Sequence, residues 1–244
     1  KGNRIGLYPH FNFDKLRVKS IISIGFENLK LKIIQIKKNI FKTIVINKGY
    51  VDSNKGVHFS NHIKIKGMTN KDIEAIAIAR KLNVKNFALS FAKNKRDVLN
   101  FRKLIGKKSD LISKIETKKA LKNLDEIIKN SDKILIDRGD LSRYVSIEKI
   151  PIVQVEILRK AKSKKTKCYV ATNLLETMVK NNQPTRAESN DIFSTLDKGA
   201  DGLVLAAETA VGKYPIECVQ FIKKCIKTYK NYEQYTKNTG LNYF

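Results

Sequence analysis

The sequence has little cysteine, and the three residues present do not form a recognisable site. Cys168, Cys218 and Cys225 are odd in number, and no two of them have the CxxC spacing of a zinc or redox pair. Such a set is typical of a protein from a reducing compartment. Cys218 and Cys225 lie seven residues apart on one apolar helix face, so we expect buried thiols without a chemical role.

Long apolar runs are also missing. No stretch approaches the ~20 consecutive apolar residues that cross a bilayer. The first thirty residues contain no basic segment followed by an apolar one. We therefore expect a cytoplasmic protein without a membrane segment, or a protein of an organelle stroma or matrix if a targeting segment precedes this chain. The 42% hydrophobic content is enough for one main domain and a small appendage.

Acidic residues are scarce, with 23 against 49 basic residues and a formal net charge of +26. Such a charge is compatible with nucleic-acid binding. Only nine of the basic residues are arginines, which are preferred for bidentate contacts to phosphates and bases. The lysines are scattered, and the one dense cluster is KSKKTK at 162–167. Nucleic-acid binding is therefore not expected to be the main function.

From Asn70 onward, helical periods alternate with short apolar runs, as a parallel α/β fold requires. The predicted helices are 71–82, 96–105, 118–129, 147–163, 186–198 and a closing helix that includes 218–229. The predicted strands are 87–91, 111–115, 133–136, 168–171 and 202–205. Before Asn70, the segments 16–26, 29–36 and 41–46 have no helices between them and predict a small antiparallel β segment.

Five strand and helix units fit either an open doubly wound sheet or part of a (β/α)8 barrel of the TIM type. No GxGxxG or GxxxxGKT string follows a strand, which argues against the nucleotide sites of open sheets. Polar residues crowd the predicted carboxyl ends of the strands, where barrel active sites lie. We therefore predict an α/β fold of the (β/α)8 type, incomplete, preceded by the antiparallel segment.

Three strand ends carry the candidate chemistry. Lys114 and Glu116 lie two residues apart in SKIET, so both side chains point to the same side of the strand. Glu116 and Asp140, the latter from DRGDL, can share a hard divalent cation. Thr172 adds a hydroxyl after the following strand. Each feature alone also fits a structural role, as an ion pair, a helix start or a cap; together they suggest handling of an anionic substrate through a metal.

The order of longer motifs resembles the pyruvate kinase family. These motifs are NKGVHF (54–59), SKIE (113–116), RGDL (138–141), VATNLLETM (170–178), NNQPTRAE (181–188) and ETAVGKYPIE (208–217). The resemblance covers roughly residues 15–229 and implies transfer of phosphate from phosphoenolpyruvate to ADP, giving pyruvate and ATP. It also implies that residues 1–56 are a remnant of the family's small β lid domain and that 57–244 form the barrel segment.

The resemblance implies a role for each matching residue. Lys114 would be catalytic, stabilising the enolate and the transferring phosphoryl group in contact with the substrate. Glu116 and Asp140 would bind Mg²⁺ or Mn²⁺. The backbone of Gly139 and Asp140, with Thr172, would hold the substrate carboxylate. Lys55 would touch the nucleotide phosphates. A K⁺ ion and a homo-oligomer are also expected, although the family's potassium ligands lie on strands outside this chain.

Several positions depart from the family pattern. Asp137 stands where the family usually has alanine, and Tyr144 stands where it has glutamate. Further departures are Lys93 for arginine, Ser142 for glycine, and Ala206 with Ala207 for serine and glycine. The family's first three barrel strands and its carboxyl-terminal domain have no counterpart here. The sequence therefore also fits a metal-dependent lyase or decarboxylase acting on a pyruvate-like enolate, or a non-catalytic pseudoenzyme.

Overall fold

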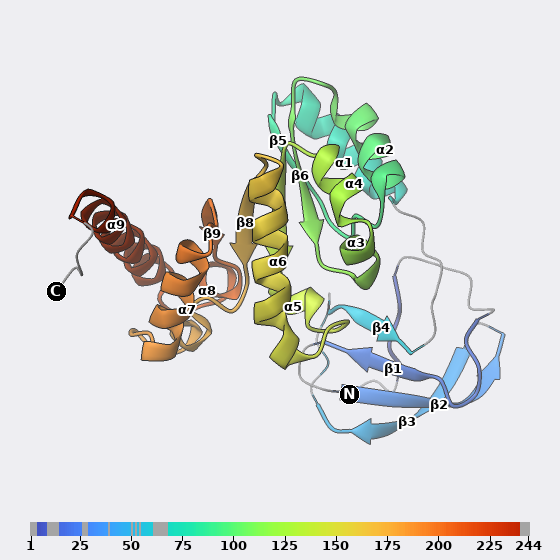
Figure 1. Cartoon of the computed structure of the whole chain (residues 1–244). Helices are drawn as coiled ribbons and strands as arrows, with labels where there is room; N and C mark the ends of the chain where they lie inside the picture. Colours follow the sequence, from blue (N-terminus) through green and yellow to red (C-terminus); the bar gives the residue numbers. More distant parts are fainter. Residues whose placement is uncertain are drawn as a thin grey trace. The chain divides into compact units, whose positions relative to one another are not determined.

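The computed structural model describes residues 4–8, 15–25, 29–38, 40–49, 51, 53, 55–60 and 68–239. The chain divides into two compact units, Lys1–Asp72 and Ile73–Phe244. Figure 1 shows an antiparallel sheet in the first unit and a parallel sheet with its helices in the second. Among the described residues, no helix has both the length and the apolar character needed to span a membrane.

The smaller unit is a four-stranded antiparallel sheet with the order β3-β2-β1-β4. Its strands are β1 (Ile21–Ile24), β2 (Leu29–Lys37), β3 (Ile40–Asn47) and β4 (Val57–Phe59). Alternate residues of β1 and β2 pack with Leu16 in a small apolar core. β4 is too short to be predicted from its pattern, and it pairs with β1. The compact unit that contains this sheet extends to Asp72.

The larger unit contains five parallel strands in the order β5-β6-β7-β8-β9. They are β5 (Asn86–Leu89), β6 (Asp110–Ile115), β7 (Lys133–Asp137), β8 (Lys167–Ala171) and β9 (Gly202–Val204). All five strands predicted from the sequence are present. In the described part of the chain β5 and β9 each pair with one neighbour, so these strands form an open sheet and not a closed barrel.

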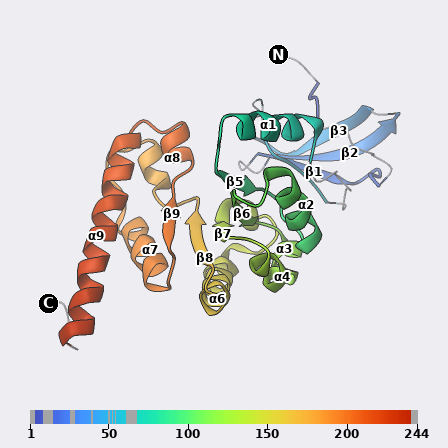
Figure 2. The same ribbon diagram turned by 90° about the horizontal axis from the view of Figure 1, so that it is seen from above.

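Helices cover one face of this sheet. Leu111, Ser113 and Ile115 of β6 are buried. α4 contacts β6, α2 contacts β5, and α6 contacts β7 and β8; these three helices lie on the same side of the strands in Figure 2. Lys114 belongs to the alternate set and therefore points to the other face. The register places Lys114 beside Leu135, and Leu135 beside Tyr169. The alternation thus turns Lys114, like Asp110 at the start of the strand, away from the helices.

The observed helices lie where the sequence predicted them, but several differ in their ends or are interrupted. The predicted helix at 118–129 is broken at Asn123, the closing helix is longer than expected, and the short helices α5 and α8 were not expected. α1 forms as predicted, but none of its residues is buried. The helices are α1 (Asn70–Lys81), α2 (Lys95–Ile105), α3 (Lys118–Lys122), α4 (Leu124–Lys129), α5 (Arg138–Leu141), α6 (Ile150–Ser163), α7 (Arg186–Asp197), α8 (Ala207–Ala210) and α9 (Pro215–Thr239), with 3-10 turns at Ile147–Lys149 and Glu176–Val179.

Two of the motifs singled out in the sequence have structural tasks. Thr185 and Glu188 of PTRAE form a capping box that starts α7, and Glu188 also accepts the Thr177 amide at 2.7 Å. Glu208 of ETAVG is buried and accepts the amides of Leu175 and Ala206 at 3.0 and 2.8 Å. Both glutamates therefore stabilise the loop that follows β8.

Arg138 links β7, the end of β8 and α7. Its Nε and Nη2 donate to the Thr172 carbonyl at 3.0 and 2.7 Å, and its Nη1 donates to both carboxylate oxygens of Asp191 at 2.9 and 2.7 Å. The Arg138 side chain is only 9% exposed. Gln154 of α6 lies 3.4 Å from Nη1 and donates onward to Thr195. No sequence motif predicted this network, because the partners of Arg138 lie 16 to 53 residues further along the chain.

We expect Arg138→Met to lower the free energy of unfolding by about 2–4 kcal/mol, because it leaves Asp191 and the Thr172 carbonyl without their donor. Arg159→Met is the matched control: Arg159 also pairs with a carboxylate, but it is 73% exposed, so its loss should cost below about 1 kcal/mol. Urea unfolding followed by circular dichroism measures both changes. Equal effects of the two substitutions would contradict a role for the buried network.

The cysteines provide a second test. Cys218 is buried, as expected, whereas Cys225, which was also expected to be buried, is half-buried; Cys168 is buried as well. Burial raises the pKa of the Cys168 thiol to about 12, with a smaller contribution from the charge of Asp201. At pH 8 roughly one in ten thousand Cys168 side chains is therefore a thiolate. In the folded protein iodoacetamide should modify Cys225 first and leave Cys168 intact, as read by peptide mass spectrometry. All three should react alike in guanidinium chloride; rapid modification of Cys168 in the folded protein would show the burial to be wrong.

Candidate active site

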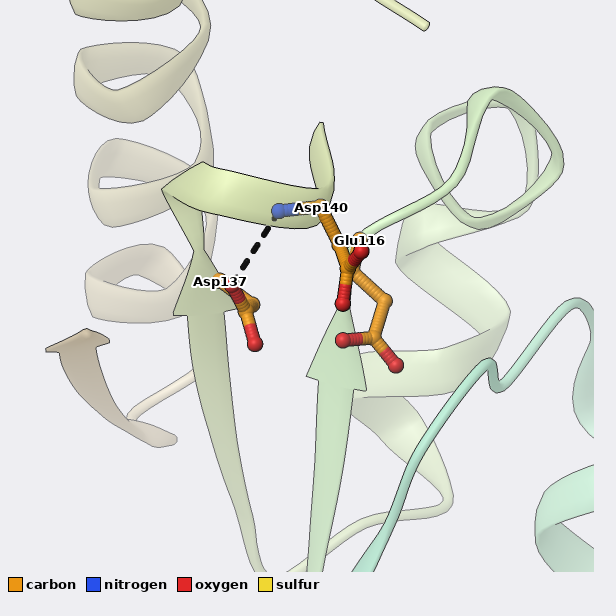
Figure 3. A group of neighbouring side chains, drawn as sticks. All are labelled: Glu116, Asp137 and Asp140. Carbon is orange, nitrogen blue, oxygen red and sulfur yellow. Dashed lines mark hydrogen bonds between the residues drawn. The ribbon is translucent and has the colours of Figure 1, made fainter. Parts of the chain in front are cut away.

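The ends of β6 and β7 bring one lysine and three carboxylates together. Lys114 is the penultimate residue of β6, and Glu116 follows that strand directly. Asp137 is the last residue of β7. α5 begins directly after it, at Arg138, and contains Asp140. Figure 3 shows the three carboxylate side chains directed toward one another above the two strands. The sequence predicted that Lys114, Glu116 and Asp140 would meet here, and the structure brings them together.

The Lys114 ammonium bridges two of the carboxylates. Its Nζ lies 2.9 Å from Glu116 Oε2 and 2.8 Å from Asp137 Oδ2. Burial alone would lower the pKa of Lys114, but the hydrogen bond to Asp137 and the charge of Glu116 outweigh burial, so the pKa lies above its usual value. Lys114 is therefore a fixed positive charge at neutral pH.

Glu116 is the most enclosed of the three carboxylates, with a side chain that is 0% exposed. Its Oε1 accepts the Phe91 amide, and Phe91 adopts a left-handed conformation with φ of 55° just beyond β5. Its Oε2 forms the ion pair with Lys114 Nζ. Burial raises the pKa of Glu116, and the Lys114 ammonium opposes that rise.

Asp137 and Asp140 are joined through the first turn of α5. Asp137 is the N-cap residue, and its Oδ1 accepts the Asp140 amide at 3.3 Å. Asp140 Oδ1 lies 3.2 Å from Arg143 Nε. Burial, followed by the charge of Asp137, raises the pKa of Asp140. Asp137 was not among the predicted site residues. It lies two residues beyond Leu135 on β7, and Leu135 pairs with Lys114, so the side chains of Asp137 and Lys114 point to the same face of the sheet.

The donor set fits a hard divalent cation. One carboxylate oxygen from each of Glu116, Asp137 and Asp140 lies within 4.8 Å of the others, and Glu116 and Asp137 are buried. Mg²⁺ and Mn²⁺ prefer such oxygen ligands, with water or substrate oxygens completing the coordination. The chemistry of the three carboxylates therefore fits such an ion.

Thr172 and Gly139 meet next to this cluster. Gly139 donates its amide to Thr172 Oγ1 at 2.8 Å, so α5 is tied to the segment after β8. Thr172 and Asn173 have φ values of 72° and 54°, which turn the chain sharply at the strand end. The amides of Gly139 and Asp140, predicted to hold a substrate carboxylate, thus both donate to side-chain oxygens of the protein.

Other predicted or divergent positions are less directly involved. Lys55 precedes β4 in the antiparallel unit, so its nucleotide contact stays a prediction. Tyr144 is 42% exposed, and burial, followed by the charge of Asp140, raises the pKa of its phenol. Ser142 donates its hydroxyl to the Gly139 carbonyl at 2.7 Å. Ala206 contributes its amide to Glu208. None of these contacts adds a further charge to the carboxylate cluster.

Comparison with known proteins places this geometry in context. The family model described as the pyruvate kinase barrel domain matches residues 7–219. The pyruvate kinase of Thermotoga maritima is 42% identical over 201 residues, which are 81% of this chain and 43% of that protein. The pyruvate kinase of Methanocaldococcus jannaschii is 36% identical over 231 residues, covering 93% of this chain and 52% of the relative. The corresponding protein of Agrobacterium vitis is 34% identical over 229 residues, covering 93% and 48%.

The chain spans about half the length of these curated relatives. All three are described as pyruvate kinases, so they give no support to the lyase or pseudoenzyme alternatives. The match reaches from the antiparallel unit to the first turn of α9 and includes every residue of the carboxylate cluster. The family model matches most of this chain, and the chain forms a parallel α/β sheet with charged strand ends. This chain therefore belongs to the pyruvate kinase family.

Proposed function

We propose that this chain provides the phosphoenolpyruvate and metal part of a pyruvate kinase site, which transfers a phosphoryl group from phosphoenolpyruvate to ADP and gives pyruvate and ATP. The observation that carries the proposal is the meeting of Lys114 with Glu116, Asp137 and Asp140 at the carboxyl ends of parallel strands. Phosphoryl transfer depends mainly on positioning and on neutralising charge, and this cluster supplies groups for both.

Lys114 is the candidate catalytic residue. Its ammonium pairs with two carboxylates, and its side chain is 21% exposed, so Lys114 can face a substrate from the rim of the cluster. In this role Lys114 stabilises the negative charge that grows on the enolate oxygen and on the transferring phosphoryl group. A lysine suits this task because its ammonium is a compact positive charge.

Glu116 and Asp140 are the candidate ligands of Mg²⁺ or Mn²⁺. When bound, such an ion would neutralise negative charge on the substrate oxygens. Glu116 is held from the other side by the Phe91 amide, and Asp140 is held by the first turn of α5. The two carboxylates therefore present their oxygens from separate strands at a defined spacing.

Gly139, Asp140 and Thr172 are the candidate site for the substrate carboxylate. Two adjacent amides at the start of a helical turn can donate to one carboxylate. In this structure the two amides donate to Thr172 Oγ1 and Asp137 Oδ1 instead. A substrate carboxylate would take the place of these oxygens, and the longer of the two bonds, 3.3 Å to Asp137, is the weaker one.

The remaining parts of the function rest on the family resemblance. We assign Lys55 to the phosphates of ADP, the antiparallel unit to the family's lid domain, and the parallel strands to part of a (β/α)8 barrel. K⁺ is expected, and we assign no residue of this chain to it. A cytoplasmic location, assembly into a homo-oligomer, and the lack of a nucleic-acid partner stay predictions from the sequence.

The metal assignment can be tested by calorimetry with Mn²⁺ and oxalate, an analogue of the enolate of pyruvate. Glu116→Gln and Asp140→Asn keep the shape of each side chain and remove its charge, so each should weaken binding by about 10- to 100-fold or more. Asp110→Asn is the control, because Asp110 also pairs with a lysine on these strands but lies at the opposite end of β6. Unchanged binding in both site variants would refute the assignment.

The role of Lys114 can be tested through exchange of the pyruvate methyl protons in deuterated water, followed by NMR in the presence of Mg²⁺. Removing a group that stabilises an enolate should slow exchange by about 10²- to 10³-fold in Lys114→Met. Lys133→Met provides the control, because Lys133 is likewise a strand lysine that pairs with an aspartate. If Lys114→Met exchanges the protons at the parent rate, Lys114 is not catalytic and only pairs with the neighbouring carboxylates.

A further inference from the structure

Asp137 is the feature of the site that the family resemblance does not explain. The resemblance implies an alanine at this position, yet the Asp137 side chain is only 10% exposed and both its oxygens are engaged. Oδ2 lies 2.8 Å from Lys114 Nζ, and Oδ1 accepts the Asp140 amide. A methyl group could make neither contact. The substitution therefore changes the charge at the centre of the site.

The cluster is short of positive charge. Lys114 is shared between Glu116 and Asp137, and Arg143 pairs with Asp140, so two cations face three carboxylates. Carboxylates this close repel one another, and the cost is greatest for the fully buried Glu116. This excess of negative charge at the strand ends points to a further cation.

We propose that Asp137 is a third carboxylate ligand of the divalent cation, beside Glu116 and Asp140, so that this site binds the cation without a substrate anion. The inference rests on the proposed function, because it takes Glu116 and Asp140 as the other ligands. Affinity for hard divalent cations rises with the number of charged ligands. A site with three carboxylates thus depends less on the substrate for ligands than a site with two.

A second consequence concerns the donors that Asp137 now occupies. A carboxylate that turns toward the cation gives up its contacts with Lys114 Nζ and with the Asp140 amide. Both of these groups are assigned above to the substrate. Asp137 would thus cover the substrate-binding donors in the metal-free protein and uncover them when the cation is bound, which favours binding of the cation before the substrate.

A competing explanation is that Asp137 only anchors Lys114. In that case the loss of Asp137 would still weaken metal binding, because the freed ammonium would pair more closely with Glu116 and compete with the cation. The two explanations differ once Lys114 is removed. If Asp137 only positions Lys114, its loss should not affect metal binding in the Lys114→Met background. If Asp137 is a ligand of the cation, its loss should still weaken binding there.

The test measures Mn²⁺ binding without substrate, using the electron paramagnetic resonance signal of free Mn²⁺ and the intact protein stripped of metal. Asp137→Asn is made in the parent protein and in Lys114→Met; it keeps an oxygen to cap the Asp140 amide, so the start of α5 is preserved. We expect Asp137→Asn to weaken binding by about 10- to 100-fold in both backgrounds. Asp110→Asn, which removes the same charge from the far end of β6, should have little effect in salt of 0.15 M.

Each outcome decides between the hypotheses. An effect of Asp137→Asn that vanishes in the Lys114→Met background would overturn the third ligand and leave Glu116 and Asp140 as the metal site. Loss of Mn²⁺ binding in Glu116→Gln but not in Asp137→Asn would have the same meaning. A parent protein that binds no Mn²⁺ without substrate would also overturn the inference. If oxalate then restores binding, the proposed function still stands; if it does not, the metal assignment fails as well.

Discussion

The site depends on one ammonium group held between two buried carboxylates from successive strands. Glu116 is fully enclosed, and an unpaired carboxylate at that position would be costly, so Lys114 has to stay close to it. Asp137 draws the same ammonium toward β7. The position of Lys114 is therefore set by the alignment of β6 and β7, and any change in their register would separate the pair.

That alignment is itself maintained by contacts away from the charged cluster. The helix-covered face of β6 and β7 consists of fully buried residues such as Leu111, Ile115, Ile134 and Ile136. Arg138 adds a polar link, because it joins the end of β7 to the Thr172 carbonyl and to α7. The apolar face fixes the strands relative to the helices, whereas Arg138 fixes the loops that carry Gly139 and Thr172. Rigid support of this kind is what a site that positions anions requires.

Much of this arrangement could be read from the sequence, and the remainder depends on contacts between distant residues. The alternation around Lys114 predicted both the strand and the common direction of Lys114 and Glu116, because strand periodicity is local. Asp137 was recognised as a departure but not as the partner of Lys114, since that requires the register of β6 against β7. The break at Asn123 and the short helix after Asp137 are set by capping and tertiary contacts, which override helical periodicity.

The two glutamates of the most recognisable motifs have a consequence for how members of this family are identified. Glu188 and Glu208 accept hydrogen bonds from backbone amides and stabilise the loop after β8. The PTRAE and ETAVG motifs that contain them therefore indicate that the fold is retained. A protein that lost Lys114 but kept both motifs would still be detected as a relative, because selection for folding alone can preserve these motifs. Inventories of this family that aim to count active enzymes should therefore examine the two strand ends around Lys114 and Asp140, where chemistry and ancestry can diverge.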